Sequence, residues 1–162
     1  PANPGENEYF PMSSRQAAET LDDQVKRAVA QGATLRTGGE MDDTSAYYSP
    51  AVLTDLPVGS DVYYEEFFGP VAEIYKVSSE AEAVELANNS YQGLGGAVFS
   101  DDTDRAIKVA DQIETGMIHV NLGQYFSAVL PFGGVKRSGF GRELSVFALD
   151  EFVNKQYLYV ND

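Results

Sequence analysis

Cysteine is absent from the 162-residue sequence. This absence excludes disulfide bonds, thiolate metal sites and a thiol nucleophile within the chain. Basic residues are also scarce, because 11 lysines and arginines stand against 25 acidic residues and leave a formal charge of −14. Contacts to phosphate groups need clustered cations, so we expect no nucleic-acid partner.

Long hydrophobic runs are missing as well. No apolar run approaches the roughly 20 residues that a membrane-spanning helix needs, and no basic start followed by an apolar stretch indicates a secretory signal. We therefore expect a cytoplasmic protein without a membrane partner. The chain begins at Pro1 rather than at a methionine, which favours a fragment or a processed product. Hydrophobic residues make up 43% of the sequence, which is enough for a globular core.

Helix-like and strand-like segments alternate along the chain. Ser13 and Gln16 form one capping box, and Ser79 and Glu82 form another, so a helix is predicted after each. Strands are predicted at 33–37, 47–54, 71–77, 95–100 and 117–121, and further helices at 102–114 and 142–149. Pro50 favours an edge or irregular position for the strand that contains it. The alternation predicts an α/β fold with a mostly parallel sheet and flanking helices.

A glycine-rich stretch from Pro131 to Glu143 holds four glycines in thirteen positions. Glycine costs backbone entropy inside helices and strands, so the stretch is typical of a loop that bends sharply or approaches another backbone closely. It is not a dinucleotide fingerprint, since Leu144 stands at the third glycine position, and it lacks the Gly-Lys-Ser/Thr of a P-loop. We expect Lys136 and Arg142 to brace this loop rather than to contact a ligand.

Candidate catalytic groups within the chain are few. The single histidine, His119, lies in a strand-like run, where a hydrogen-bonded structural role is commoner than that of a base. No cluster has the spacing of metal ligands, so no metal site is expected. Glu65 and Glu66 could supply acid–base chemistry, but adjacent residues of a strand point to opposite faces, so at most one faces a given site. A solvated acidic turn is the alternative.

Several blocks of residues become specific when they are taken as an ordered set. They are Glu65-Glu66-Phe67-Phe68-Gly69-Pro70-Val71, Asn88-Asn89-Ser90 with Gly93-Leu94, Gly116 to Asn121, and Pro131 to Glu143. Together they resemble the C-terminal part of the catalytic domain of the NAD(P)-dependent aldehyde dehydrogenase superfamily, with succinate-semialdehyde dehydrogenases as a candidate subgroup. The resemblance implies that residues 1–150 are this part of the domain and that residues 151–162 are an oligomerisation arm.

The resemblance implies a parent protein that oxidises an aldehyde to a carboxylic acid with NAD or NADP. The nucleophilic cysteine and the dinucleotide-binding domain would lie upstream, so we expect this chain alone to be inactive. Glu66 would accept hydrogen bonds from the nicotinamide ribose, because a carboxylate is a natural acceptor for a vicinal diol. Phe68 would pack beside that ribose and limit where the hydride donor and acceptor meet.

The resemblance also implies which residues contact the substrate. Phe126 and Phe132 match aromatic positions of the substrate funnel, where they would hold the tail of the aldehyde and exclude water. No lysine or arginine lies between Asn121 and Pro131, which favours an apolar or aromatic aldehyde, whereas Ser127 keeps a semialdehyde acid open. Glu143 matches a glutamate that relays protons. Its alternative interpretation is a first-turn carboxylate favoured by the helix dipole.

The last segment, Phe152 to Val160, is rich in tyrosine and valine and predicts a terminal strand. A strand with no later partner in the chain is an exposed edge, which is often covered by another subunit. The resemblance implies a homo-oligomer that assembles through this strand and acts on a small aldehyde. A free-standing, non-catalytic module for assembly or regulation is the alternative for the whole chain.

Overall fold

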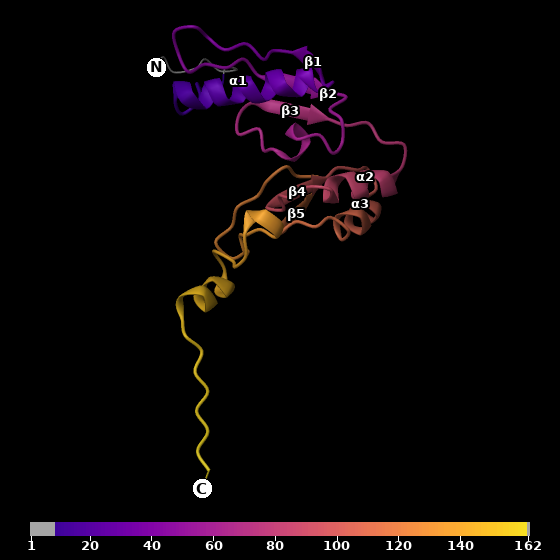
Figure 1. The fold of residues 1–162 in the computed structure, drawn as a ribbon. Coiled ribbons are helices and arrows are strands. Elements are labelled where there is room, and N and C mark those ends of the chain that lie inside the picture. The colour runs from indigo at the N-terminus through magenta and orange to yellow at the C-terminus, as the bar shows by residue number, and fades with distance from the viewer. Residues whose placement is uncertain (1–8, 162) are drawn as a thin grey trace. The chain divides into compact units, whose positions relative to one another are not determined.

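The computed structural model describes residues 9–161, and the chain divides after Lys76 into two units (Figure 1). The first unit contains α1 (Arg15–Ala30), β1 (Thr34–Thr37), β2 (Ala51–Thr54), the 3₁₀ helix η1 (Val62–Tyr64) and β3 (Val71–Ile74). The second contains α2 (Glu80–Asn88), β4 (Gly95–Val98), α3 (Thr103–Ala110), β5 (Met117–Val120) and the 3₁₀ helices η2 (Lys136–Ser138) and η3 (Val146–Phe152). The predicted α/β class is confirmed.

The strands form two small sheets instead of the one mostly parallel sheet that the sequence predicts. In the first unit the order is β1-β2-β3, with β1 antiparallel and β3 parallel to β2. In the second unit β4 and β5 are parallel. The chain between β1 and β2 contains no helix and can return in the antiparallel direction, whereas α3 makes the crossover between β4 and β5.

Strand β2 lies in the centre of its sheet, so the edge position, one of the two alternatives predicted from Pro50, is wrong, whereas its pairing with β1 is irregular and shifts register between Leu35 and Thr37. The proline precedes the first paired residue of the strand, Ala51, whose own N–H donates to the carbonyl of Pro70 at 2.9 Å. The missing N–H of Pro50 therefore costs no hydrogen bond of the ladder.

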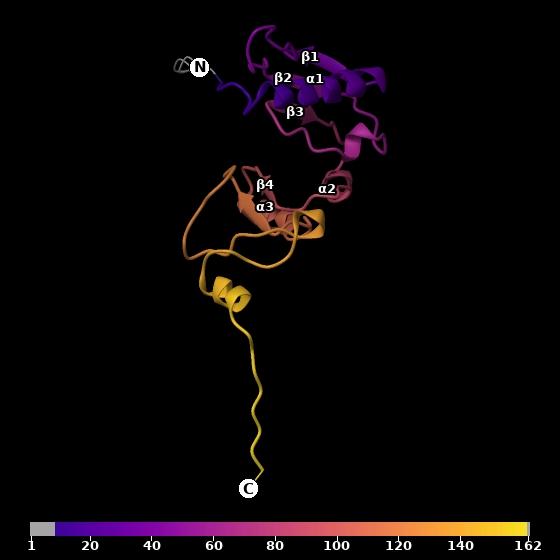
Figure 2. The same ribbon diagram turned by 60° about the vertical axis from the view of Figure 1, so that its left-hand side comes forward.

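The core of the first unit lies between α1 and the three-stranded sheet (Figures 1 and 2). Helix α1 begins one residue later than predicted, because the side chain of Ser14, not Ser13, accepts a hydrogen bond from the N–H of Ala17. Its buried residues recur every three or four positions and are Ala18, Leu21, Val25 and Ala28. Most of them share one cluster with Leu53 of β2 and Val62 of η1. The amphipathic pattern thus fixes which face of the helix is covered.

In the second unit, both α-helices start at capped positions. The Ser79 hydroxyl accepts a hydrogen bond from the N–H of Glu82, as predicted, and an Asp102 carboxylate oxygen accepts one from the N–H of Arg105. Helix α3 packs against β4 and β5. Among residues 9–161, no helix combines the length and the apolar character that crossing a membrane requires.

The glycine-rich loop is closed at its ends by backbone pairing. The N–H of Phe132 donates to the carbonyl of Glu143 at 2.8 Å, and the N–H of Glu143 donates back at 2.7 Å. Near its start the loop passes over Gly116, where a Cβ would lie only 2.7 Å from the carbonyl carbon of Gly133 and 2.8 Å from the Cα of Gly134. The close backbone approach predicted from the glycines is therefore present.

Two basic side chains hold this loop in place. The Lys136 ammonium group donates to the carbonyl of Asn88 at 2.7 Å and forms an ion pair with Glu114 at 2.9 Å. The Arg142 guanidinium donates to two carbonyl groups of the loop itself, at 2.6 and 2.9 Å. These contacts match the bracing role expected from the sequence.

The helix predicted at 142–149 begins later and is a 3₁₀ helix. Glu143 forms the bridge with Phe132, and Leu144 and Ser145 have φ angles of 58° and 54°. Such angles lie outside the right-handed helical region, so η3 starts only at Val146. Glu143 is thus not a first-turn residue, and the interpretation through the helix dipole is wrong.

The predicted strand from Phe152 to Val160 is not formed. Phe152 ends η3, and residues 153–161 have neither helix nor strand. Their side chains are exposed, with 83% of Tyr157 accessible. A strand needs a hydrogen-bonded neighbour, and among the described residues none pairs with this segment.

Candidate functional site

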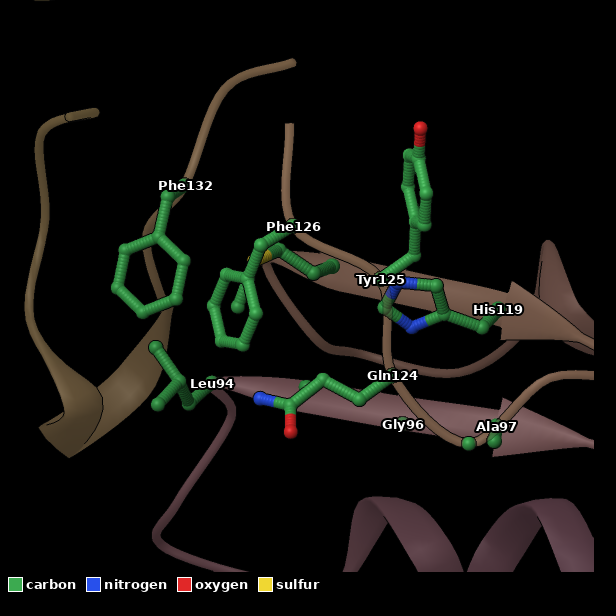
Figure 3. A pocket seen from close by; sticks show the side chains of 11 residues that line it. Leu94, Gly96, Ala97, His119, Gln124, Tyr125, Phe126 and Phe132 are labelled. Atoms are coloured by element: carbon green, nitrogen blue, oxygen red, sulfur yellow. The ribbon is translucent and has the colours of Figure 1, made fainter. Parts of the chain in front are cut away.

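A pocket of about 320 Å³ lies in the second unit (Figure 3). It is lined by residues 94–97 at the start of β4, by Met117 and His119 of β5, by residues 123–126 and by Phe132. Alternate residues of a strand share a face, so Met117 and His119 present their side chains to the same side of the sheet. On this side the neighbouring strand contributes Gly95 and Ala97, which pair with Met117 and His119 and are small enough to leave room for a ligand.

Two phenylalanines form one wall of the pocket. The ring centroids of Phe126 and Phe132 are 5.7 Å apart, and the ring planes are tilted by 31° (Figure 3). Phe126 comes from the loop after β5, and Phe132 is fixed by its backbone pairing with Glu143. The structure therefore brings together two residues that the sequence assigns to a substrate funnel.

Ser127 and Glu143 lie outside this lining. The Ser127 hydroxyl accepts a hydrogen bond from the N–H of Val129 at 3.4 Å, and the side chain is half-buried. The Glu143 side chain is exposed, and its link to the pocket is the backbone bridge to Phe132. Within residues 9–161, no three histidine, aspartate or glutamate side chains are grouped closely enough to hold a metal ion.

Of the polar residues that line the pocket, Gln124 and Tyr125 were not singled out by the sequence, and His119 was assigned a structural role. His119 of β5 lines the pocket together with Gln124 and Tyr125 of the loop that follows this strand (Figure 3). The signal that could have found them is their place at the carboxyl end of a parallel strand, where ligands bind in α/β sheets. Asn121 shapes this turn with a φ of 56°, and its side-chain amide bonds both the N–H and the carbonyl of Ser100.

In the first unit, the Glu65 carboxylate is bound by side chains of the protein itself. Its two carboxylate oxygens accept hydrogen bonds from the Arg27 guanidinium at 2.7 and 2.6 Å, and one also accepts from the Gln24 amide at 3.1 Å. The Arg27 charge and hydrogen bonds hold the pKa of Glu65 below its usual value. Glu65 is thus a structural carboxylate.

Glu66 and Phe68 are directed outward. The residues at 65–68 alternate between half-buried and exposed, and Phe67 packs against the core of this unit. Phe68 is 80% exposed, and among the described residues the Glu66 carboxylate has no hydrogen-bond or ion-pair partner. A carboxylate that the protein leaves open beside an exposed ring suits a ligand with adjacent hydroxyl groups, such as a ribose.

Comparison with known proteins adds independent evidence. The family model described as "Aldehyde dehydrogenase family" matches residues 2–158. Succinate-semialdehyde dehydrogenase [NADP(+)] of Deinococcus radiodurans is 51% identical over 157 residues, which are 96% of this chain and 33% of that protein. The mitochondrial succinate-semialdehyde dehydrogenase of Mus musculus is 40% identical over 149 residues, 91% of this chain and 28% of that protein.

Solved structures agree with these matches. Succinic semialdehyde dehydrogenase from Streptococcus pyogenes in complex with NADP+ is 46% identical, with a TM-score of 0.90, and the match covers 98% of this chain and 35% of that one. Betaine aldehyde dehydrogenase from Staphylococcus aureus in complex with NAD+ is 34% identical, with a TM-score of 0.87 over 92% of this chain and 30% of that one. The chain spans about a third of the length of the relatives it matches.

Proposed function

The chain belongs to the aldehyde dehydrogenase family, and from this premise we propose that the protein containing it oxidises an aldehyde to a carboxylic acid with NAD+ or NADP+. The aromatic pocket above β4 and β5 is the observation that carries the proposal. It is a concave, mostly apolar site with a few polar groups, which is the usual character of a small-molecule site. A bound nicotinamide cofactor would supply the hydride acceptor for this oxidation.

Glu66 and Phe68 are the residues of this chain that we assign to the cofactor. The fit rests on the exposed Glu66 carboxylate, which offers two acceptor oxygens to the two hydroxyls of a ribose, while Glu65 is held by Arg27. Phe68 offers an exposed ring as a packing surface next to it. The two side chains would hold the ribose in one place and orientation, which limits the geometries open to the reactants.

Phe126 and Phe132 are assigned to the aldehyde. Their rings would cover the apolar part of the substrate and keep water away from it. His119 lies in the same pocket and can donate a hydrogen bond to a carboxylate at the far end of the substrate. We therefore propose a semialdehyde acid as the substrate class, supported by relatives named succinate-semialdehyde dehydrogenase, although an apolar or aromatic aldehyde is favoured by the loop composition alone.

Further roles follow from the same assignment. Ser127 follows Phe126 in the chain, and its hydroxyl would help to hold a polar substrate end. Glu143 would relay protons away from the site, with its position set by the bridge to Phe132. Residues 151–162 would serve as an oligomerisation arm, for which the exposed apolar side chains after η3 provide the contact surface. The nucleophile is not part of this chain, which contains no cysteine.

The test uses the chain and its complete reading frame. The purified 162-residue chain, mixed with NAD+ or NADP+ and a panel of apolar aldehydes and semialdehyde acids, should produce no reduced cofactor, whereas the product of the complete reading frame should do so. The reading frame should encode an upstream cysteine. Turnover by the chain alone, or no turnover by the complete product, would contradict the proposal. A complete product that only assembles into oligomers would favour the second candidate, a non-catalytic assembly module, which the exposed apolar residues of η3 and 153–160 support.

A further inference from the structure

Side chains of helix α1 bind residues 65–69, the segment that carries Glu66, the proposed ribose contact. The Arg27 guanidinium bonds both oxygens of Glu65 in a fork, at 2.7 and 2.6 Å. One turn earlier, the Gln24 amide donates at 3.1 Å both to the Glu65 carboxylate and to the backbone carbonyl of Glu66. The helix therefore holds the residue before Glu66 and the backbone of Glu66 itself, while the Glu66 carboxylate is left open.

Leu21, one turn before Gln24 in the helix, packs against the other end of the segment. A Cβ on Gly69 would overlap the side chain of Leu21, which is 99% buried, so the backbone of Gly69 lies directly against α1. Phe67 packs against the same core. Leu21, Gln24 and Arg27 are spaced by three residues, so one stripe of the helix runs along residues 65–69. Residues 65–69 lie before β3 and outside any strand, but their exposure alternates, so the alternate residues Glu66 and Phe68 are directed outward while the inward residues are held by this stripe.

We infer that Arg27 and Gln24 are positioning residues for the nicotinamide ribose, acting through Glu65 and the backbone of Glu66. Neither side chain would touch the cofactor. This inference rests on the proposed function, in which Glu66 binds the ribose. In it, Glu65 orients Glu66. A fork of two parallel hydrogen bonds is suited to this task, because it fixes an angle as well as a distance.

The choice of arginine is part of the argument. A lysine can form only a point contact with Glu65, so it would keep the charge pair while losing the fixed orientation. Both side chains of the pair are partly exposed, at 38% for Arg27 and 34% for Glu65, so the pair as such adds only modestly to stability. Its loss should therefore affect the orientation of the segment more than the folding of the unit.

The experiment uses the enzyme made from the complete reading frame. Dissociation constants for NAD+ and NADP+ are measured by calorimetry, together with the KM for each cofactor and for the aldehyde. Arg27→Ala and Gln24→Ala should weaken binding of the preferred cofactor by about fivefold to tenfold, a change of about 1 to 1.4 kcal/mol. The KM for the aldehyde should stay within twofold. Binding of adenosine diphosphate, which lacks the nicotinamide ribose, should not change.

Lys26→Ala is the matched control. It removes an ion pair between Lys26 and Asp22 on the same helix but no contact to residues 65–69, and cofactor binding should be unchanged. Arg27→Lys should give an intermediate loss and covers the case in which Arg27→Ala fails to fold. Equal losses for adenosine diphosphate and for the dinucleotide would overturn the inference, because they would indicate a general structural defect.

Glu66→Gln separates the inference from the proposed function. If this substitution leaves cofactor binding unchanged, the assignment of Glu66 to the ribose fails, and the positioning role fails with it. If Glu66→Gln weakens binding while Arg27→Ala, Arg27→Lys and Gln24→Ala do not, the proposed function stands and only the positioning role is wrong.

Discussion

Gly116 offers the sharpest test of how the pocket is built. In the substitution Gly116→Ala, the new methyl group would lie 2.7 Å from the carbonyl carbon of Gly133 and 2.8 Å from the Cα of Gly134. Ordinary contact begins near 3.4 Å, and the carbonyl oxygen of Gly133 would lie closer to the new methyl group than either carbon, so the loop would have to move away by more than about 0.7 Å. All three are backbone atoms, which cannot swing aside as a flexible side chain can.

The cost can be worked from these contacts. Overpacking of this kind costs about 1–3 kcal/mol. The movement also strains the hydrogen bond between the Gly116 N–H and the Gly93 carbonyl, whose oxygen accepts a second bond from Val135, and each such bond contributes about 1 kcal/mol. We therefore expect Gly116→Ala to destabilise the second unit by about 3 kcal/mol.

Urea unfolding followed by circular dichroism measures the loss, and hydrogen exchange of residues 131–143 locates it. Gly123→Ala is the matched control, because a Cβ at Gly123 meets no atom within 4 Å. It should leave the unfolding midpoint unchanged. Equal stability and equal exchange for both variants would refute the conclusion that the loop is held against Gly116 by backbone contact.

Three further predictions concern the remaining features. The hydrogen bonds from Arg27 lower the pKa of Glu65 in the folded state, so the ionised carboxylate stabilises the fold fully above its unfolded pKa of about 4.5. This stabilisation is lost as the pH falls through the lower pKa of the folded state. In urea titrations at several pH values, Glu65→Gln should therefore reduce the fall in unfolding free energy on acidification by about 1 kcal/mol, and an unchanged fall would contradict this. The Tyr48 hydroxyl is buried without a hydrogen-bond partner among the described residues, and burial raises its pKa to about 12. Tyr48→Phe removes this unpaired group and should raise the unfolding free energy by about 1 kcal/mol. A clear fall in the unfolding free energy would show that the hydroxyl has a hydrogen-bond partner. Phe126 is 60% exposed in this chain, so Phe126→Ala should leave the melting temperature of the 162-residue chain nearly unchanged. In the complete enzyme the same substitution should raise the KM for the aldehyde severalfold, and an unchanged KM would remove Phe126 from the substrate site.

Local patterns could be read from the sequence because they depend on neighbouring residues. The capping box at Ser79 set the start of α2 as predicted. The glycines of the loop indicated a close backbone approach, which occurs at Gly116. The ordered motif blocks led to the family that the comparison confirms. The cap of α1 was misplaced by one residue, since Ser13 and Ser14 are both able to accept the hydrogen bond and only the helix geometry chooses between them.

Long-range contacts could not be predicted from the sequence, because they join residues that are tens of positions apart in the chain. Nothing local distinguishes Glu65 from Glu66 until Arg27 binds the first of them across 38 residues. Likewise, the bridge that joins Phe132 to Glu143 overrode the predicted helix.

The sequence by itself determined the family, the segments that form α1, α2 and α3, the absence of a thiol nucleophile and the residue types available to bind a ligand. Only the tertiary structure decided which of two adjacent carboxylates is left open, that β2 is central, and that His119 shares a pocket with Phe126 and Phe132. Composition and periodicity act along the chain, whereas these outcomes depend on which side chains meet across it. They follow from packing and hydrogen bonding between distant segments, which only the folded backbone specifies.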